Sequence, residues 1–294
     1  MSKNLVIVES PTKARTIGRF LGSQYEVAAS MGHVRDLSQS GKDKLGIDIQ
    51  GDPLEFKPKY RTLPDKGNKK TVSDITSLAE KADVVYLATT IGLHFKQGKK
   101  ILLHGKHLWS EKSLACNYQE VNNLVKIAKK NKLAVCEAFM YLYHPIFKKL
   151  KELLKKKTIG DIYFVNFNFF CPHLKKTNWR YKKKLGGGAL LDLGCYPISA
   201  YLNLFNLNLK VFFSYLSTEL HFKVDTSGLI FLKNKNLLFK LSWGLGFEYQ
   251  NNCRIFGKKG SIDVTPFFSK PFERQSKIRI YKKNSVKEIK IEKS

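Results

Sequence analysis

The chain has 294 residues, which is long enough for two domains with buried cores. It carries 52 lysine and arginine residues against 24 aspartate and glutamate residues, a formal net charge of +28. No apolar run reaches the roughly 18 residues of a membrane-spanning helix and the N-terminus lacks the apolar stretch of a secretion signal, so we expect a soluble cytoplasmic protein without a membrane partner.

The positive charge is unevenly distributed. Residues 1–90 hold 14 basic and 11 acidic residues, whereas residues 91–294 hold 38 and 13. The second part also contains 15 asparagines and 18 phenylalanines, against two of each in the first. Such a bias favours solvated lysine faces over a dedicated nucleic-acid surface, while non-specific binding to DNA or another polyanion stays open. The abrupt change near residue 90 indicates two sources for the chain.

The first 90 residues predict alternating strands and helices. Leu5–Val8 is expected to form a strand, and Ser10-Pro11 to open a helix with proline at its first position. Apolar spacing predicts a second helix over 72–82 and then a buried parallel strand at Asp83–Thr90. This order is typical of an α/β domain with a parallel sheet.

The alternation continues after residue 90. A helix is predicted over 93–103 and ended by Gly105, followed by a strand at 107–110. Asn117 is expected to cap the next helix, and Pro145 opens another after a strand at 133–136. Beyond residue 159 the pattern predicts strands at 162–170, 210–217, 227–232, 237–243, 253–256, 261–264 and 277–281, and a charged end follows at 287–294.

Three motifs near the N-terminus resemble the Toprim domain of bacterial DNA topoisomerase I. They are NLVIVESPTKA at 4–14, ASMGHVRDL at 29–37 and KPKYRTLPDKG at 57–67. The resemblance implies that Glu9 belongs to a Mg²⁺-dependent strand-transfer site. The family then has acidic residues after the LAT tripeptide, where this chain has the segment 90–94, TIGLH. Because Mg²⁺ needs several oxygen ligands, we expect Glu9 to hold no metal and this segment to be inactive.

The remainder of the chain resembles the Gfo/Idh/MocA oxidoreductases, in the branch of dihydrodiol dehydrogenase and glucose–fructose oxidoreductase. The matching pieces keep the order of the family and are ATTIGLHFKQGKKILLHGKH at 88–107, SEKSLACN at 110–117, EAFMYLYHP at 137–145, NWRYKKKLGGGALLDLGCYPI at 178–198 and RIFGKKGSIDVTPFF at 254–268. The resemblance implies a Rossmann domain followed by an open, mainly antiparallel sheet.

Three catalytic residues follow from this resemblance. Hydride transfer at a carbinol or carbonyl carbon needs a group that moves the hydroxyl proton. The family pattern assigns that role to Tyr196, and it assigns to Lys112 the tuning of the tyrosine and the binding of the substrate oxygen. Asp192 is a further polar group of the site. Each also has a structural interpretation, since Lys112 follows a glutamate as surface lysines often do, Asp192 could cap a helix and Tyr196 could be core.

The resemblance also implies an NADP or NAD site. Its nicotinamide half would comprise Thr89, Thr90, Leu93, His94, Glu111 and Lys112, with Trp179 and Arg180 from the second domain. The glycine-rich G-x-G-x-x-G turn that binds the pyrophosphate has no counterpart in residues 1–82. In addition, Ser113 stands where the family has proline, so we expect the bend beside Lys112 to be lost.

We therefore predict an α/β N-terminal domain, Toprim-like in its first half and Rossmann-like in its second, followed by an α+β domain with a mainly antiparallel open sheet. The expected parts are 1–90, 83–144 and 145–294. The favoured function is a hybrid oxidoreductase acting on a sugar, polyol or dihydrodiol, weakened by the missing turn and able to form a homodimer through the C-terminal sheet. The alternatives are a topoisomerase-derived DNA-binding module and a fusion product without function. The five cysteines lack zinc-site spacing and are expected to be reduced thiols.

Overall fold

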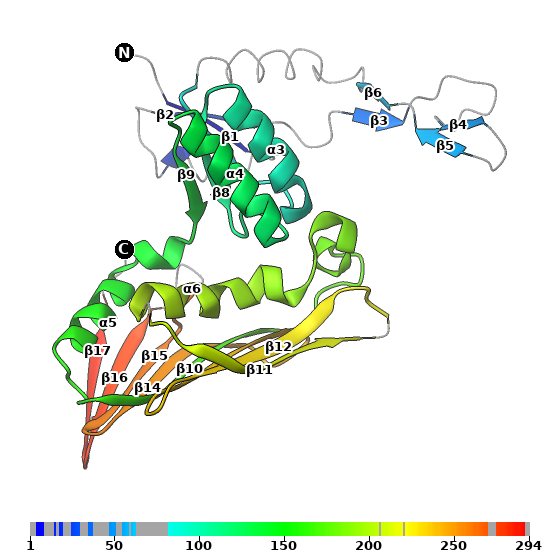
Figure 1. Cartoon of the computed structure of the whole chain (residues 1–294). Coiled ribbons are helices and arrows are strands. Elements are labelled where there is room, and N and C mark those ends of the chain that lie inside the picture. The colour runs from blue at the N-terminus through cyan, green and yellow to red at the C-terminus, as the bar shows by residue number, and fades with distance from the viewer. Residues whose placement is uncertain are drawn as a thin grey trace. The chain divides into compact units, whose positions relative to one another are not determined.

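The computed structural model describes residues 82–205, 207–219, 221–269 and 275–291, together with six short strands and residues 15, 18 and 19 in the first 81 positions (Figure 1). The chain divides into two compact units. The first comprises residues 1–89, 96–111 and 122–136, and the second comprises residues 90–95, 112–121 and 137–294. Glu9, the start of the helix expected at Ser10-Pro11 and nearly all of the helix expected at 72–82 lie outside the described residues.

The first unit contains two sets of parallel strands. β1 (Asn4–Val8) pairs with β2 (Tyr25–Ala29), and β7 (Val84–Leu87) pairs with β8 (His107–Glu111), which is followed in the sheet by β9 (Val135–Ala138). β1 also lies alongside β7, so the strands follow one another in the order β2, β1, β7, β8, β9. Strands from the two differently composed parts of the sequence thus neighbour each other within this unit.

The strand β7 differs from its prediction in one respect. The apolar sequence indicated a buried strand, but only Leu87 is buried and Val84 is 42 % exposed. The expectation of full burial was therefore wrong, because valine and tyrosine favour strands through their shape even where one end of the strand is open to solvent. Four further strands form two antiparallel pairs, β3 (Arg35–Leu37) with β6 (Tyr60–Thr62) and β4 (Ile47–Gln50) with β5 (Glu55–Pro58).

Helices α3 (Ile91–Leu103) and α4 (Tyr118–Lys130) follow the expected pattern. Gly105 ends α3 with a positive φ of 71°, and the Asn117 side chain accepts a hydrogen bond from the backbone N–H of Glu120 at 2.9 Å. β9 begins two residues later than predicted. The reason is the end of α4, where Leu133 still donates its N–H to the carbonyl of Ala128.

The second unit is built on an eight-stranded sheet in the order β11, β12, β13, β10, β14, β15, β16, β17. β10 and β13 are parallel and all other neighbours are antiparallel, which confirms the predicted sheet type. The strands are β10 (Ile162–Cys171), β11 (Lys210–Thr218), β12 (Asp225–Lys233), β13 (Leu238–Leu245), β14 (Gln250–Gly257), β15 (Gly260–Thr265), β16 (Lys277–Lys282) and β17 (Ser285–Lys290).

The last strand, β17, was missed by the sequence analysis. Its residues are mostly exposed, so it lacks the alternation of buried apolar residues that marks an inner strand. Glu288 instead forms ion pairs with Lys277 at 3.2 Å and Arg279 at 3.0 Å on the neighbouring strand. Cross-strand charge pairs can hold such an edge strand in register without a hydrophobic signal.

Two helices cover one face of this sheet in Figure 1, α5 (Pro145–Lys155) and α6 (Cys195–Leu204). α6 continues directly from a π-helical turn, η4 (Leu190–Gly194), and three short 3-10 turns precede it: η1 (Met140–Tyr143), η2 (Trp179–Tyr181) and η3 (Lys183–Leu185). Alternate residues of β10 point into the core, which is why Val165, Phe167 and Phe169 are buried. Among the described helices, none is both long and apolar enough to cross a lipid bilayer.

Candidate functional site

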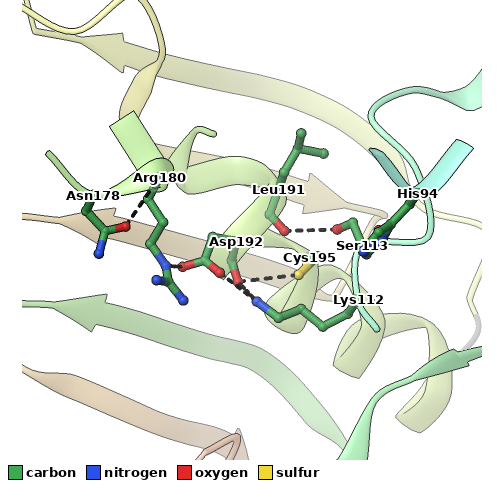
Figure 2. A network of polar contacts seen from close by, with 8 residues as sticks. All are labelled: His94, Lys112, Ser113, Asn178, Arg180, Leu191, Asp192 and Cys195. Carbon is green, nitrogen blue, oxygen red and sulfur yellow. Dashed lines mark hydrogen bonds and ion pairs between the residues drawn. The ribbon is translucent and has the colours of Figure 1, made fainter. Parts of the chain in front are cut away.

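A buried carboxylate holds two cations in the second unit (Figure 2). Lys112, which directly follows β8, donates from Nζ to Oδ1 of Asp192 at 2.7 Å and to the main-chain carbonyl of the same residue at 2.6 Å. Arg180 donates from Nε to the other carboxylate oxygen, Oδ2, at 2.5 Å. The three residues come from segments far apart in sequence, and the fold brings them to one point.

Asp192 remains ionised in this setting. Burial of its side chain opposes the charged form, but the positive charges of Lys112 and Arg180 and their hydrogen bonds outweigh that effect and hold the pKa of Asp192 below its ordinary value. Because both carboxylate oxygens are engaged, the geometry suits a residue that positions its neighbours. A carboxylate with a lowered pKa is a poor proton donor at neutral pH.

The backbone beside Lys112 is fixed by two further contacts. Ser113 donates its hydroxyl to the carbonyl of Leu191 at 2.9 Å, and Nδ1 of His94, near the start of α3, lies 2.7 Å from the carbonyl oxygen of Ser113. That nitrogen must donate, since a carbonyl only accepts. The peptide bond between Lys112 and Ser113 is cis. We had expected the bend beside Lys112 to be lost without proline. That expectation was wrong, because the chain bends here with Ser113 in the position of the proline.

Tyr196 lies next to this cluster, on the first turn of α6. It is 5 % exposed, and Nζ of Lys112 lies 5.0 Å from the centroid of its ring. Phe139 and Phe169 pack edge-on against the same ring, with centroid separations of 5.5 and 5.1 Å. Tyr196 thus belongs to the aromatic core, as its structural interpretation predicted, and it also contacts Lys112.

Several other residues expected at a cofactor site contact neighbours outside the cluster of Lys112, Asp192 and Tyr196. In the first unit, Glu111 accepts a hydrogen bond from the Tyr86 hydroxyl, and burial followed by this carboxylate raises the pKa of Tyr86. Thr89 donates to Oε1 of Gln97 at 2.6 Å, also in the first unit. In the second unit, the Arg180 guanidinium stacks on the ring of Trp179 at 4.7 Å.

Two residues near Lys112 were not singled out from the sequence. Glu137 accepts a hydrogen bond from the backbone N–H of Leu114 at 2.8 Å, and burial raises its pKa although that bond and the charge of Lys112 act in the opposite direction. Burial also raises the pKa of the Cys195 thiol to about 12. Glu137 opens the motif at 137–145, and an acidic residue at a strand end was the only signal that could have identified it.

Comparisons with known proteins match the two ends of the chain to different families. The family model of the Toprim domain matches residues 4–90. The model described as the oxidoreductase family with an NAD-binding Rossmann fold matches residues 56–139, and the model of the GFO/IDH/MocA C-terminal domain matches residues 147–263. The first two matches overlap at 56–90, so that segment satisfies both families.

Individual relatives come from both kinds of protein. DNA topoisomerase 1 of Campylobacter jejuni is 48% identical over 104 residues, which cover 35% of this chain and 13% of the topoisomerase. A dTDP-3,4-didehydro-2,6-dideoxy-alpha-D-glucose 3-reductase of Saccharopolyspora spinosa is 31% identical over 208 residues, which cover 70% of this chain and 63% of the reductase. The chain thus spans less than two thirds of the length of that reductase.

The chain thus joins a segment similar to the Toprim domain to segments similar to the Gfo/Idh/MocA oxidoreductases. Its fold resembles that of a solved 3-ketoreductase of Actinomadura kijaniata in complex with NADP and TDP-benzene, with a TM-score of 0.77 and 21% identity. The match covers 99% of this chain and 85% of the ketoreductase. Lys112 lies within the Rossmann match, and Arg180, Asp192 and Tyr196 lie within the C-terminal match.

The oxidoreductase segment offers one observation that fits a dinucleotide. The Thr90 hydroxyl, directly before α3, is buried and has no hydrogen-bond partner among the described residues. Leaving such a group unpaired costs about 1–3 kcal/mol, which a polar atom of a ligand would relieve. Leu93, in the first turn of α3, is 40 % exposed. An unpaired hydroxyl beside an exposed apolar side chain fits a bound ligand, whereas the sequence of residues 1–82 provides no glycine-rich turn for a pyrophosphate.

Glu9, which the resemblance assigns to a Mg²⁺ site and which we expected to hold no metal, lies outside the described residues. Among the residues that the structure describes, no group of three or more His, Cys, Asp or Glu side chains could hold a metal ion. The described cysteines are all free thiols, with Cys136 exposed and Cys253 buried.

Proposed function

We propose that the chain acts as an NAD(P)-dependent oxidoreductase on a hydroxyl or carbonyl group of a sugar-like substrate. The observation that carries this proposal is the placement of Lys112 between the carboxylate of Asp192 and the ring of Tyr196. Bound NADP or NAD would supply or accept the hydride. The residues of the chain would bind the reacting oxygen and move its proton.

Each residue has a distinct part in this proposal. Tyr196 exchanges the proton of the substrate hydroxyl through its phenol, and Lys112 binds the same oxygen and stabilises the charged form of the phenol. Asp192 holds the ammonium in place, and Arg180 binds the second oxygen of the same carboxylate. Thr90, Leu93 and His94 border the nicotinamide, together with Trp179 of the same unit.

The missing glycine-rich turn sets the expected strength of cofactor binding. Without a backbone cradle at the first βα turn, the pyrophosphate loses its main anchor. Each unmade charge-assisted hydrogen bond costs about 1.5–3 kcal/mol, so we propose that the dinucleotide binds weakly and that activity is low.

The substrate class is suggested by a basic segment beside the site. Residues 175–184 include five lysines as well as Arg180, and Lys182, Lys183 and Lys184 are exposed. A relative reduces a dTDP-linked sugar according to its name. We propose that this segment favours a phosphorylated or nucleotide-linked sugar over a neutral polyol or dihydrodiol.

The test is a titration of the whole purified chain with NADPH and NADH, followed by energy transfer from tryptophan. We expect saturable binding in the micromolar to millimolar range that is weakened in Lys112→Ala and Tyr196→Phe. The exposed variant Lys157→Ala is the matched control and should bind as the parent does. Absence of binding up to millimolar cofactor would refute the proposed function.

The Toprim match favours a second candidate, a topoisomerase-derived DNA-binding function. It requires Mg²⁺-dependent nicking of supercoiled DNA that disappears in Glu9→Ala. Salt-sensitive DNA binding alone would not support it, because a chain with a net charge of +28 attracts polyanions without any specific site. Failure of both assays would favour a fusion product without function.

We also propose boundaries for the parts of the chain and a dimer contact. We infer three parts, at 1–90, 83–144 and 145–294, with the last providing a homodimer contact through its sheet. Limited proteolysis followed by mass spectrometry tests the boundaries, and light scattering tests the dimer.

A further inference from the structure

Asp225, the first residue of β12, has a role that the proposed reaction does not use. Its Oδ2 accepts a hydrogen bond at 2.6 Å from the backbone N–H of Leu190. Leu190 is the first residue of η4, which carries Asp192 and runs directly into α6 with Tyr196. A carboxylate from a distant strand therefore satisfies a free N–H at the start of this helix, where negative charge is favoured.

Gly188 makes room for this carboxylate. A Cβ at this position would lie 2.3 Å from Oδ1 of Asp225, and its φ of +125° disfavours other residues. The backbone of Gly188 also links Arg180 to Asp192. Its N–H donates to the carbonyl of Arg180 at 2.9 Å, and its carbonyl accepts from the N–H of Asp192 at 3.2 Å. The glycine thus lies at the junction of Arg180, Asp192 and Asp225.

The environment of Asp225 is costly for a charged group. Burial raises its pKa, while backbone N–H groups, that of Leu190 foremost, oppose the shift. Among the described residues Asp225 forms none of the ion pairs. A half-buried carboxylate whose partners are backbone N–H groups of a helix start is suited to fixing the position of that helix.

We propose that Asp225 is a positioning residue that anchors the start of η4 and thereby keeps Asp192 in contact with Lys112. Removing the anchor frees the first turn of the helix, so Asp192 moves relative to Lys112 and the ammonium becomes accessible. The consequence for catalysis rests on the proposed function, but the placement of Lys112 can be measured without any cofactor.

The experiment compares the acylation rates of individual lysines in the whole chain by mass spectrometry. Lys157, exposed and 3.3 Å from Asp161, serves as the internal standard. In Asp225→Ala we expect the Lys112 rate relative to Lys157 to rise about fivefold, the population change that corresponds to about 1 kcal/mol for one lost hydrogen bond. Asp225→Asn keeps an oxygen acceptor for Leu190 and should stay within about twofold of the parent.

Two controls separate positioning from general loosening. Gly188→Ala displaces the same carboxylate and also strains the backbone that bonds Asp192, so it should raise the Lys112 rate at least as much as Asp225→Ala does. Asp263→Ala removes another half-buried aspartate of the same sheet, paired with Arg254 at 3.1 Å, and should leave Lys112 unchanged.

The outcomes are distinct. An unchanged Lys112 rate in Asp225→Ala, or an equal rise at every lysine, would overturn the proposal. If Asp225→Ala does not fold, Gly188→Ala decides by the same readout. Failure of the parent chain to bind NADPH would refute the proposed function while leaving the Lys112 measurement valid, because acylation is measured without cofactor.

Discussion

Lys112 donates to two different oxygens of Asp192, one on its side chain at 2.7 Å and one on its main chain at 2.6 Å. The two residues are 80 positions apart in sequence. One acceptor belongs to the backbone of η4 and the other to a carboxylate. The position of the ammonium therefore depends on the position of η4 as well as on the charge of Asp192. Lys112 is only 14% exposed and the Asp192 side chain 5%, so water screens this pair weakly.

Replacing Asp192 with asparagine should destabilise the protein strongly. The change keeps the size of the side chain but leaves Lys112 and Arg180 as neighbouring cations without a counter-charge. Breaking a buried ion pair in this way typically costs about 3–5 kcal/mol, and the partial exposure of Arg180 places the expected loss near 3 kcal/mol. Urea denaturation measures it. The exposed Asp161→Asn should change stability by less than about 0.5 kcal/mol, and equal effects of the two variants would contradict the role of Asp192.

The same carboxylate should make stability depend on pH. The pKa of Asp192 is lower in the folded protein than in the unfolded chain, so the unfolded chain binds more protons as the pH falls. The stabilisation is complete above the unfolded value of about 3.9 and is lost as the pH falls below it. The difference in unfolding free energy between the parent and Asp192→Asn, measured from pH 7 downward, should therefore shrink on acidification.

Asp225 should give the opposite trend. Burial raises its folded pKa, so the folded protein binds more protons than the unfolded chain in the interval above about pH 3.9. The contribution of Asp225 is therefore most favourable at low pH and declines as the pH rises through its folded value. The difference in unfolding free energy between the parent and Asp225→Asn, measured over the same pH range, should therefore decline as the pH rises. Parallel pH curves for Asp192→Asn and Asp225→Asn would contradict both assignments.

The sequence was sufficient for much of the fold because local signals and tertiary packing agree. Asn117 and Gly105 bound their helices as expected, since capping depends on neighbouring backbone groups alone. Strand β10 was recognisable because its alternate residues are buried. The exposed edge strand β17 was not, because it is held by Glu288 and its basic partners.

The candidate site was predictable in its residues and not in its connections. Family motifs identified Lys112, Asp192 and Tyr196, which the fold brings together. The ion pair between Arg180 and Asp192 depends on tertiary geometry. The sequence had suggested only a cofactor contact for that arginine. Asp225 carried no local signal at all, because its partner Leu190 lies 35 residues away.

The cysteines should differ widely in reactivity. Burial raises the pKa of the Cys195 thiol to about 12 and that of Cys253 well above its usual range, whereas Cys136 is exposed. At pH 8 the thiolate fraction of Cys195 is about a thousandfold below that of an ordinary thiol. Iodoacetamide followed by peptide mass spectrometry should label Cys136 first, and in guanidinium chloride all five should react alike. Early labelling of Cys195 in the folded protein would contradict its burial.

The basic segment should control affinity for phosphorylated ligands if the proposed substrate class is right. Replacing all three lysines of 182–184 with glutamine removes three exposed positive charges beside Arg180. Because each exposed charge near an anion contributes a fraction of a kcal/mol, the affinity for dTDP measured by calorimetry should fall about five- to tenfold. The binding should also become less sensitive to salt. The matched control replaces Lys151 and Lys155 of α5 and its C-cap Lys156, which are also exposed and carry the same total charge. An equal loss in both triple variants would mean that only net charge matters, and the segment 182–184 would then have no specific part in substrate binding.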